Sequence, residues 1–311
     1  MLLCIGDRKV KFEFVRKIKD KFKKERASCE DAKKTIVGTK EYDINIDNLQ
    51  TIKDFKSKYW QDKDNSDYYY RTVEHSFFDA VSSKYFLKYI KPSDKVLDCG
   101  AGTGRLTVKI AEIAAEVTAQ DISQAMLSHI SNGGGGEANI KTVCCDARNI
   151  PFADNSFDVV TSCDFICHII DWKAYLKESL RLVKKGGYLI FSAYNGDNFA
   201  KISKNRNMKE ILEKMMYGSQ YVVNQTKQEL LEFAQDNHAD LIKIQPYNLF
   251  AGTSLWCDKL SAQEIYQLRV LIGKTYEVPK FLELIKLFEE RIVKDMDSDD
   301  CMHMIVVIKK K

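Results

Sequence analysis

The sequence predicts an α/β fold in which a mainly parallel sheet carries helices on both faces. A buried strand at 95–99 runs into a glycine-rich turn and then into a helix that extends to about Ala115. Beyond it, apolar strand-like runs alternate with helical patterns up to residue 195, which is typical of doubly wound sheets. With 311 residues and 45% hydrophobic composition, the chain is long enough to bury such a core.

The turn after the first strand carries glycines at alternate positions, Gly100, Gly102 and Gly104. Glycine permits positive φ and lets a ligand approach the backbone, although such a turn also occurs without any ligand. The G-x-G-x-G spacing is tighter than the G-x-G-x-x-G of dinucleotide-binding turns. Asp98, directly before the turn, would repel a phosphate and attract a cation. Together these features predict a positively charged ligand without phosphates.

The following segments place further polar residues at strand ends. A second strand at 117–120 ends at Asp121 and precedes a helix that contains Met126 and Leu127. A third strand at 140–144 leads to Asp146 and Ala147. The fourth strand, the next helix, a turn and the fifth strand are expected at 157–162, 172–183, 184–187 and 188–192. The fourth strand runs into Cys163, Asp164 and His168.

This order of elements resembles the class I S-adenosylmethionine (SAM) methyltransferases. The glycine turn with Asp98 resembles their motif I, Asp121 their ribose-binding acid, and Asp146 with Ala147 their adenine-binding pair. The resemblance implies a three-layer Rossmann-like sheet of seven strands with the last one antiparallel, with SAM as cofactor and S-adenosylhomocysteine as product. It implies cofactor contacts from Asp98, Gly100, Ala101, Gly102, Gly104, Arg105, Asp121, Ile122, Met126, Asp146, Ala147 and Cys163.

An aromatic segment, 59–89, precedes the first strand. In the family, helices at this place fold over SAM, so the resemblance implies a lid with Tyr70 and Arg71 near the methionine carboxylate. An arginine there would bind the carboxylate through two hydrogen bonds. A plain helical layer on the sheet edge explains the segment equally well.

After the fifth strand the pattern is interrupted twice, at about 195–225 and 251–294. A helix at 227–236 capped by Thr226 and strands at 241–247 and 302–308 continue the fold between and after them. The interruptions contain helical patterns at 208–216, 262–272 and 281–292. Ligands bind at the carboxyl ends of strands in such sheets, so we expect a substrate cap, with a homodimer interface as the alternative. Residues 66–311 would then form the SAM-binding domain.

Residues 1–65 are expected to be a basic helical extension. From Arg8 to Arg26 there are ten basic and three acidic residues, and Phe14, Ile18 and Phe22 recur at helical spacing. The favoured interpretation is a surface helix with its lysines in water; a membrane- or RNA-binding helix is the alternative. The net charge of +4 does not by itself call for nucleic acid.

Composition also excludes several classes. The nine scattered cysteines and the absence of a signal-like N-terminus favour reduced thiols in the cytoplasm. No apolar run reaches the roughly 18 residues of a membrane span. There is no C-x-x-C zinc motif, and the Cys163 and Cys167 pair lacks the third cysteine of an iron–sulfur motif, so we expect no metal.

The chemistry predicted is methyl transfer from a sulfonium, which needs an aligned nucleophile and, for a hydroxyl, a base. His168, just past the fourth strand, is the candidate base, although a histidine there is often structural. With Asp164 it would suit an amine acceptor. The turn after the fourth strand lacks the proline-rich motif of base and amide methyltransferases, which favours an N or O atom of a small molecule. The alternative is RNA or protein bound through the basic N-terminus.

Overall fold

The structure, a computed structural model, describes residues 77–132, 138–202, 223–247, 278–293 and 298–311 and the single positions 61, 204, 260 and 264. All of them belong to the unit formed by Asn45–Lys311. The strands are β1 Lys95–Cys99, β2 Glu116–Asp121, β3 Ile140–Cys144, β4 Phe157–Ser162, β5 Val183–Asn195, β6 Asn224–Gln225, β7 Ala239–Tyr247 and β8 His303–Lys310. The helices are α4 Phe77–Leu87, α5 Arg105–Ala111, α6 Gln124–Asn132, α7 Trp172–Leu182, α8 Gly196–Ile202, α10 Lys227–Asp236 and α12 Pro279–Val293, with short 3-10 turns η1 Ile166–His168 and η3 Ser298–Asp300.

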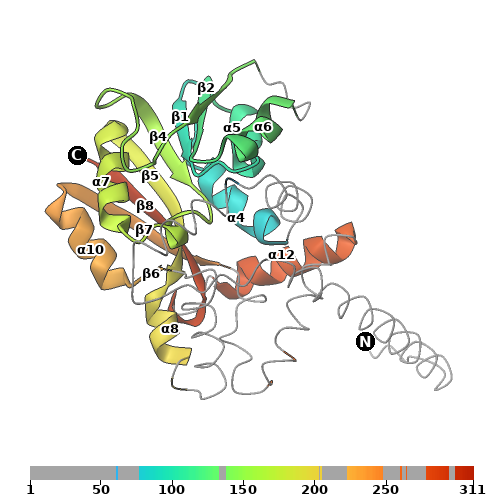
Figure 1. Ribbon diagram of the computed structural model, residues 1–311. Coiled ribbons are helices and arrows are strands. Elements are labelled where there is room, and N and C mark those ends of the chain that lie inside the picture. Colours follow the sequence, from blue (N-terminus) through green and yellow to red (C-terminus); the bar gives the residue numbers. More distant parts are fainter. Residues whose placement is uncertain are drawn as a thin grey trace. The chain divides into compact units, whose positions relative to one another are not determined.

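Within these residues the strands form one sheet with the order β3-β2-β1-β4-β5-β8-β7, and β6 pairs with the end of β5. Strands β1 to β5 run parallel, whereas β8 lies antiparallel between β5 and β7 (Figure 1). The seven strands of the main path and the antiparallel last strand confirm the predicted Rossmann-like sheet. The short β6 was not predicted.

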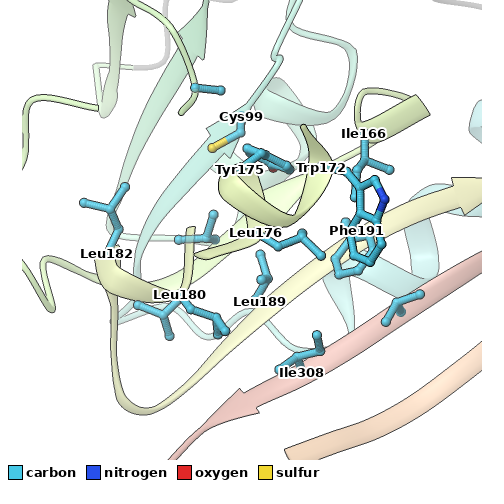
Figure 2. Packing of buried hydrophobic residues seen from close by; sticks show 14 of the residues in the cluster. Cys99, Ile166, Trp172, Tyr175, Leu176, Leu180, Leu182, Leu189, Phe191 and Ile308 are labelled. Carbon is cyan, nitrogen blue, oxygen red and sulfur yellow. The ribbon is translucent and has the colours of Figure 1, made fainter. Parts of the chain in front are cut away.

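Helices cover both faces of this sheet (Figure 1). On one face α7 and α10 bury Tyr175, Leu176 and Phe233 against β4, β5 and β8. Figure 2 shows the α7 side chains standing over Leu189 and Phe191 of β5. On the other face α4 and α5 pack on β1, β2 and β8. Because both faces are covered, the central strands are apolar without alternation, as expected for a parallel sheet.

The largest differences between predicted and observed ends are those of α5 and β5. Helix α5 stops at Ala111 instead of about Ala115, because the side-chain amide of Asn139 donates hydrogen bonds to the carbonyl oxygens of Ala111 and Ala114 (3.0 and 2.9 Å). Strand β5 begins at Val183, before the predicted turn. Its ladder with β4 passes from Phe157–Val183 to Val159–Tyr188, so the turn survives as a bulge inside the strand.

The cap predictions fall largely outside the described residues. This applies to the helices expected at 208–216 and 262–272, to the extension 1–65 and to most of both interruptions. Of the interruptions, the structure describes α8, β6 and α12. Leu282 and Ile285 of α12 pack against the α4 and α5 face of the core, whereas Phe281 and Phe288 on its other side are exposed.

Helix α10 begins with the predicted cap. The hydroxyl of Thr226 accepts a hydrogen bond from the backbone N–H of Glu229 (3.2 Å), and the Glu229 carboxylate accepts one from the backbone N–H of Thr226 (2.8 Å). This reciprocal capping box satisfies two backbone donors that the helix start would leave unpaired.

Replacing Thr226 with alanine should therefore lower the free energy of unfolding by about 1 kcal/mol, the usual value of such a cap. Urea denaturation followed by circular dichroism measures the change. Thr226→Ser keeps the hydroxyl and serves as the control. Equal midpoints for the alanine and serine variants would contradict the stabilising role of the capping box.

Candidate functional site

The turn between β1 and α5 adopts left-handed backbone at its glycines. Gly100 and Gly102 have φ values of 64° and 56°, which other residues rarely adopt. A Cβ on Gly100 would come within 2.1 Å of the Phe165 ring, so Phe165 packs directly on this turn. A Cβ on Gly102 would meet nothing within 4 Å among the described residues. The outer side of the turn is therefore open at Gly102, where the spacing predicted a ligand.

Side chains at the end of β2 hold the turn in place. The backbone N–H of Gly100 donates to the Gln120 side-chain oxygen (3.2 Å), and that of Gly102 donates to a carboxylate oxygen of Asp121 (2.9 Å). The Gln120 amide in turn donates to the carbonyl of Cys145 after β3 (2.5 Å). Both backbone donors are therefore engaged within the protein. Sequence reasoning also missed Gln120, although it directly precedes Asp121.

Asp98 lies beneath the turn instead of facing its open side. Only 2% of the residue is exposed, and its two carboxylate oxygens accept hydrogen bonds from the hydroxyls of Thr107 (2.7 Å) and Thr161 (2.9 Å). Burial raises the pKa of Asp98 from 3.8 to about 6, although both hydrogen bonds and the charge of Arg105 act against the rise. The carboxylate can therefore act on a ligand above the turn through its charge.

Arg105, the first residue of α5, forms an ion pair with Asp164 in the turn after β4. Its Nη2 lies 2.7 Å from Asp164 Oδ2, and the side chains are 8% and 34% exposed. Asp164 has a φ of 54° and also accepts hydrogen bonds from the hydroxyls of Ser192 (3.3 Å) and Tyr247 (3.5 Å). Burial alone would raise the pKa of Asp164, but the charges of Arg105 and His303 and its hydrogen bonds hold the pKa below its ordinary value. Asp164 is therefore an anion at neutral pH.

The remaining predicted residues lie along the same edge of the sheet. Asp121 is 8% exposed, and its second oxygen accepts a hydrogen bond from the Ser123 backbone (2.9 Å). The side chain of Ile122 is an exposed apolar group beside it, whereas Met126 and Ala147 are buried. The Asp146 carboxylate binds the guanidinium of Arg148 in a two-point contact.

Two side chains after β4, those of His168 and Cys163, could take part in a reaction at this edge of the sheet. His168 ends η1 and is half-buried, and its backbone N–H donates to the Phe165 carbonyl (2.9 Å). The Cys163 sulfur lies 3.4 Å from Arg105 Nη2, and burial together with the charge of Asp164 raises the pKa of the thiol to about 12. Cys163 therefore stays protonated at neutral pH. Tyr70 and Arg71, predicted near the cofactor, lie outside the described residues.

The described ranges hold neither a metal-binding cluster nor a membrane-spanning helix. In them, no three or more His, Cys, Asp or Glu side chains are grouped so that they could hold a metal ion. No helix in these ranges is long and apolar enough to cross a membrane.

Comparison with known proteins shows the family of the chain. Residues 97–191 match the methyltransferase domain family. A demethylmenaquinone methyltransferase of Corynebacterium urealyticum is 39% identical over 106 residues, which are 34% of this chain and 44% of that protein. A demethylmenaquinone methyltransferase of Mycobacterium sp. strain JLS is 38% identical over 159 residues, 44% of this chain and 67% of the relative. The chain belongs to the class I SAM-dependent methyltransferases. This methyltransferase thus matches less than half the length of the first relative named.

A solved structure shows the same fold. The SAM-dependent methyltransferase of Thermotoga maritima superimposes with a TM-score of 0.52 at 17% identity, covering 84% of this chain and all of that one. The sheet and its helices are therefore those of the family.

The residues at the turn of this methyltransferase fit the family's cofactor, SAM. Among the described residues the backbone is open at Gly102; Asp121 accepts its N–H, and the buried Asp98 carboxylate ends β1 just before the turn. Two carboxylates suit a ligand that carries an ammonium and a sulfonium and no phosphate. Asp121, at the tip of β2, keeps lone pairs for ribose hydroxyls, and the exposed Ile122 offers an apolar surface to a base.

The raised pKa of Asp98 predicts how stability depends on pH. The folded protein binds the Asp98 proton more tightly than the unfolded chain does. The contribution of this proton to the free energy of unfolding is therefore fully present below pH 3.8 and is lost as the pH rises through about 6. Asp98→Asn cannot ionise and should be destabilised less by rising pH than wild type. Between pH 4.5 and 7.5 the difference in unfolding free energy should move by about 2 kcal/mol in favour of the variant.

Urea denaturation of both proteins at a series of pH values without cofactor measures this. Asp236→Asn, an exposed change at the end of α10, is the control. If the difference in unfolding free energy between wild type and Asp98→Asn stays constant with pH, Asp98 does not titrate in this range.

Proposed function

We propose that this protein transfers a methyl group from SAM to an N or O atom of a small molecule. The observation that carries the proposal is the contact between the two halves of the site. Arg105, which opens the helix of the glycine turn, is ion-paired with Asp164 at the tip of β4. This pair fixes an ionised, partly exposed carboxylate next to the start of α5, where we expect the methyl donor to bind. Bound SAM would supply the methyl group from its sulfonium, and the leaving group would be a neutral thioether.

The protein's own part is to hold the acceptor in line and to remove its proton. We assign the alignment of the acceptor to Asp164, because its carboxylate stays ionised at neutral pH and its side chain is partly exposed. A carboxylate with a lowered pKa is a weak base but a strong hydrogen-bond acceptor. We assign the second task to His168, which follows Asp164 on η1.

The ion pair changes the class of acceptor that this site favours. Sequence reasoning paired Asp164 with an amine, because a lone carboxylate attracts an ammonium. The guanidinium of Arg105, 2.7 Å away, already compensates that charge. An acceptor that presents a neutral hydroxyl, or an amine that has already lost its proton, therefore suits Asp164 better than a cation.

The relatives supply a first compound to test. Both are named as demethylmenaquinone methyltransferases, which supports a small acceptor of that kind. Methylation of such a compound would form a carbon–methyl bond, so a labelled quinol would support the small acceptor and overturn the N or O part of the proposal. A cytoplasmic location, a homodimer and the absence of a nucleic-acid partner stay predictions from the sequence.

The decisive measurement uses methyl-labelled SAM with cell extract that has been separated by solvent extraction and filtration into lipids, small metabolites and macromolecules. We expect label from the wild-type protein in a lipid or metabolite fraction, with a demethylmenaquinone-type quinol as the first pure compound tried. Asp121→Ala is the blank, because it removes the carboxylate that accepts the Gly102 N–H. Label in RNA or protein would overturn the proposal and favour the basic N-terminus as a docking segment.

The role of His168 is tested separately once a labelled acceptor is known. His168→Ala should lower kcat by about 10²-fold or more, the usual contribution of a general base. The affinity for S-adenosylhomocysteine should stay unchanged in calorimetry. Near-normal turnover would remove the base assignment while leaving the methyltransferase assignment intact.

A further inference from the structure

Three ring side chains form a row across the edge of the sheet at which β5 ends. His303, the first residue of β8, pairs with Tyr194 of β5 on one side and with Tyr247 of β7 on the other. Residues that pair directly across strands point to the same face. The ring centroids of His303 lie 4.4 Å from those of Tyr194 and 5.5 Å from those of Tyr247, and His303 is 6% exposed. The imidazole is thus fixed between two phenol rings.

This row is connected to the Asp164 carboxylate. Oδ1 of Asp164 accepts hydrogen bonds from the Tyr247 hydroxyl (3.5 Å) and from the Ser192 hydroxyl (3.3 Å), while Oδ2 binds Arg105. The charge of His303 is among the causes that hold the pKa of Asp164 down. The two carboxylate oxygens therefore have separate surroundings, Arg105 on one side and the β5, β7 and β8 row on the other.

Packing alone does not explain a histidine at this position. The next residues of β8, 304–308, are all apolar and buried, as expected of a central strand. An apolar residue at 303 would fill the same space without the cost of burying a polar ring. His303 instead places a group that can gain charge near neutral pH at the end of the strands, where Asp164 lies.

We propose that His303 is a positioning residue of the methyl-transfer site, whose imidazolium holds the Asp164 carboxylate in the orientation that the methyl acceptor needs. This inference rests on the proposed function. Around the imidazole the charge of Arg105 is constant, and burial raises the pKa of Cys163 to about 12 and that of Tyr247 well above its ordinary value. Among the described residues, Tyr194 and Tyr247 flank the imidazole and Tyr247 binds Asp164, whereas Arg105 and Cys163 contact the other oxygen of Asp164. Of these side-chain types, an imidazole is the one that ordinarily gains charge near pH 7.

The first test needs no substrate. Side-chain NMR follows the imidazole signals of the whole protein against pH, and the signal lost in His303→Gln identifies His303. If the ring acts on the carboxylate, Asp164→Asn should lower the pKa of His303 by about one unit, because an opposite charge nearby favours the charged ring. An unchanged pKa, or an imidazole that does not titrate between about pH 5 and 9, would overturn the inference.

Asp164→Asn removes the ion-pair partner of Arg105, and loss of that pair can unfold the protein. A second variant therefore tests the same link between His303 and Asp164. Tyr247→Phe removes one hydrogen bond to Asp164 but keeps the ring that packs on His303. It should shift the NMR signal of the His303 ring and its pKa in a protein that still melts cooperatively. Identical titration curves in wild type and Tyr247→Phe, with Asp164→Asn unfolded, would also count against the inference.

The second test uses the acceptor fraction found with labelled SAM. His303→Gln should lower kcat about tenfold, as expected when a reacting group loses its alignment, and leave KM for SAM unchanged. It should also remove the alkaline fall of the rate, since that fall reports loss of the imidazolium. His238→Asn, an exposed change at a left-handed turn position, is the matched control.

The outcomes separate the two proposals. A lower melting temperature with normal kcat and an unchanged pH profile would reduce His303 to a structural residue and overturn the inference. Wild-type protein that labels no small molecule would instead refute the proposed function, whereas the NMR coupling between His303 and Asp164 is measured independently of any acceptor.

Discussion

The two hydrogen bonds from the backbone of Gly100 and Gly102 to Gln120 and Asp121 hold the turn on which the site depends. They tie the end of β1 to the end of β2, although left-handed glycine backbone is favourable in many other arrangements. With the turn held, α5 begins at Arg105, and Arg105 can reach Asp164 beyond β4. The hydrogen bonds of two backbone amides thus help to place Arg105 at the start of α5 where it can pair with Asp164, which is distant in sequence.

The same region carries polar groups that the fold does not require. Asp98 is a buried carboxylate whose ionised form is disfavoured, and Arg105 with Asp164 is an ion pair of which one partner is almost fully buried. Apolar residues of similar size often stabilise a core as well as such groups do. Their concentration at one edge of the sheet, next to the glycine turn, is the pattern expected of a site where charge is arranged for a ligand.

The sequence predicts the elements better than the site. Strands β1, β3 and β4 lie at their predicted bounds because each is a short apolar run next to glycine or a polar residue, and the α10 cap follows from Thr226 and Glu229. The predicted end of α5 was wrong because the helix ends where the side chain of Asn139, which lies outside it, donates a hydrogen bond to the carbonyl oxygen of Ala111. The closeness of His303 to Asp164 depends on the register of β8 between β5 and β7, and local patterns carry no information about that register.

The position of β8 also determines the order in which the sheet can be completed. Strands β5 and β7 are its neighbours, yet β8 follows β7 only after segment 248–302. While the chain is being synthesised, both neighbours therefore present open edges whose backbone groups can pair with other chains. Closing the sheet requires β8 to pair both with β5 and with β7, whose only strand partner in the described sheet is β8, and contacts of such high sequence separation form slowly. The nascent protein is thus most exposed to misassociation just before its last strand arrives.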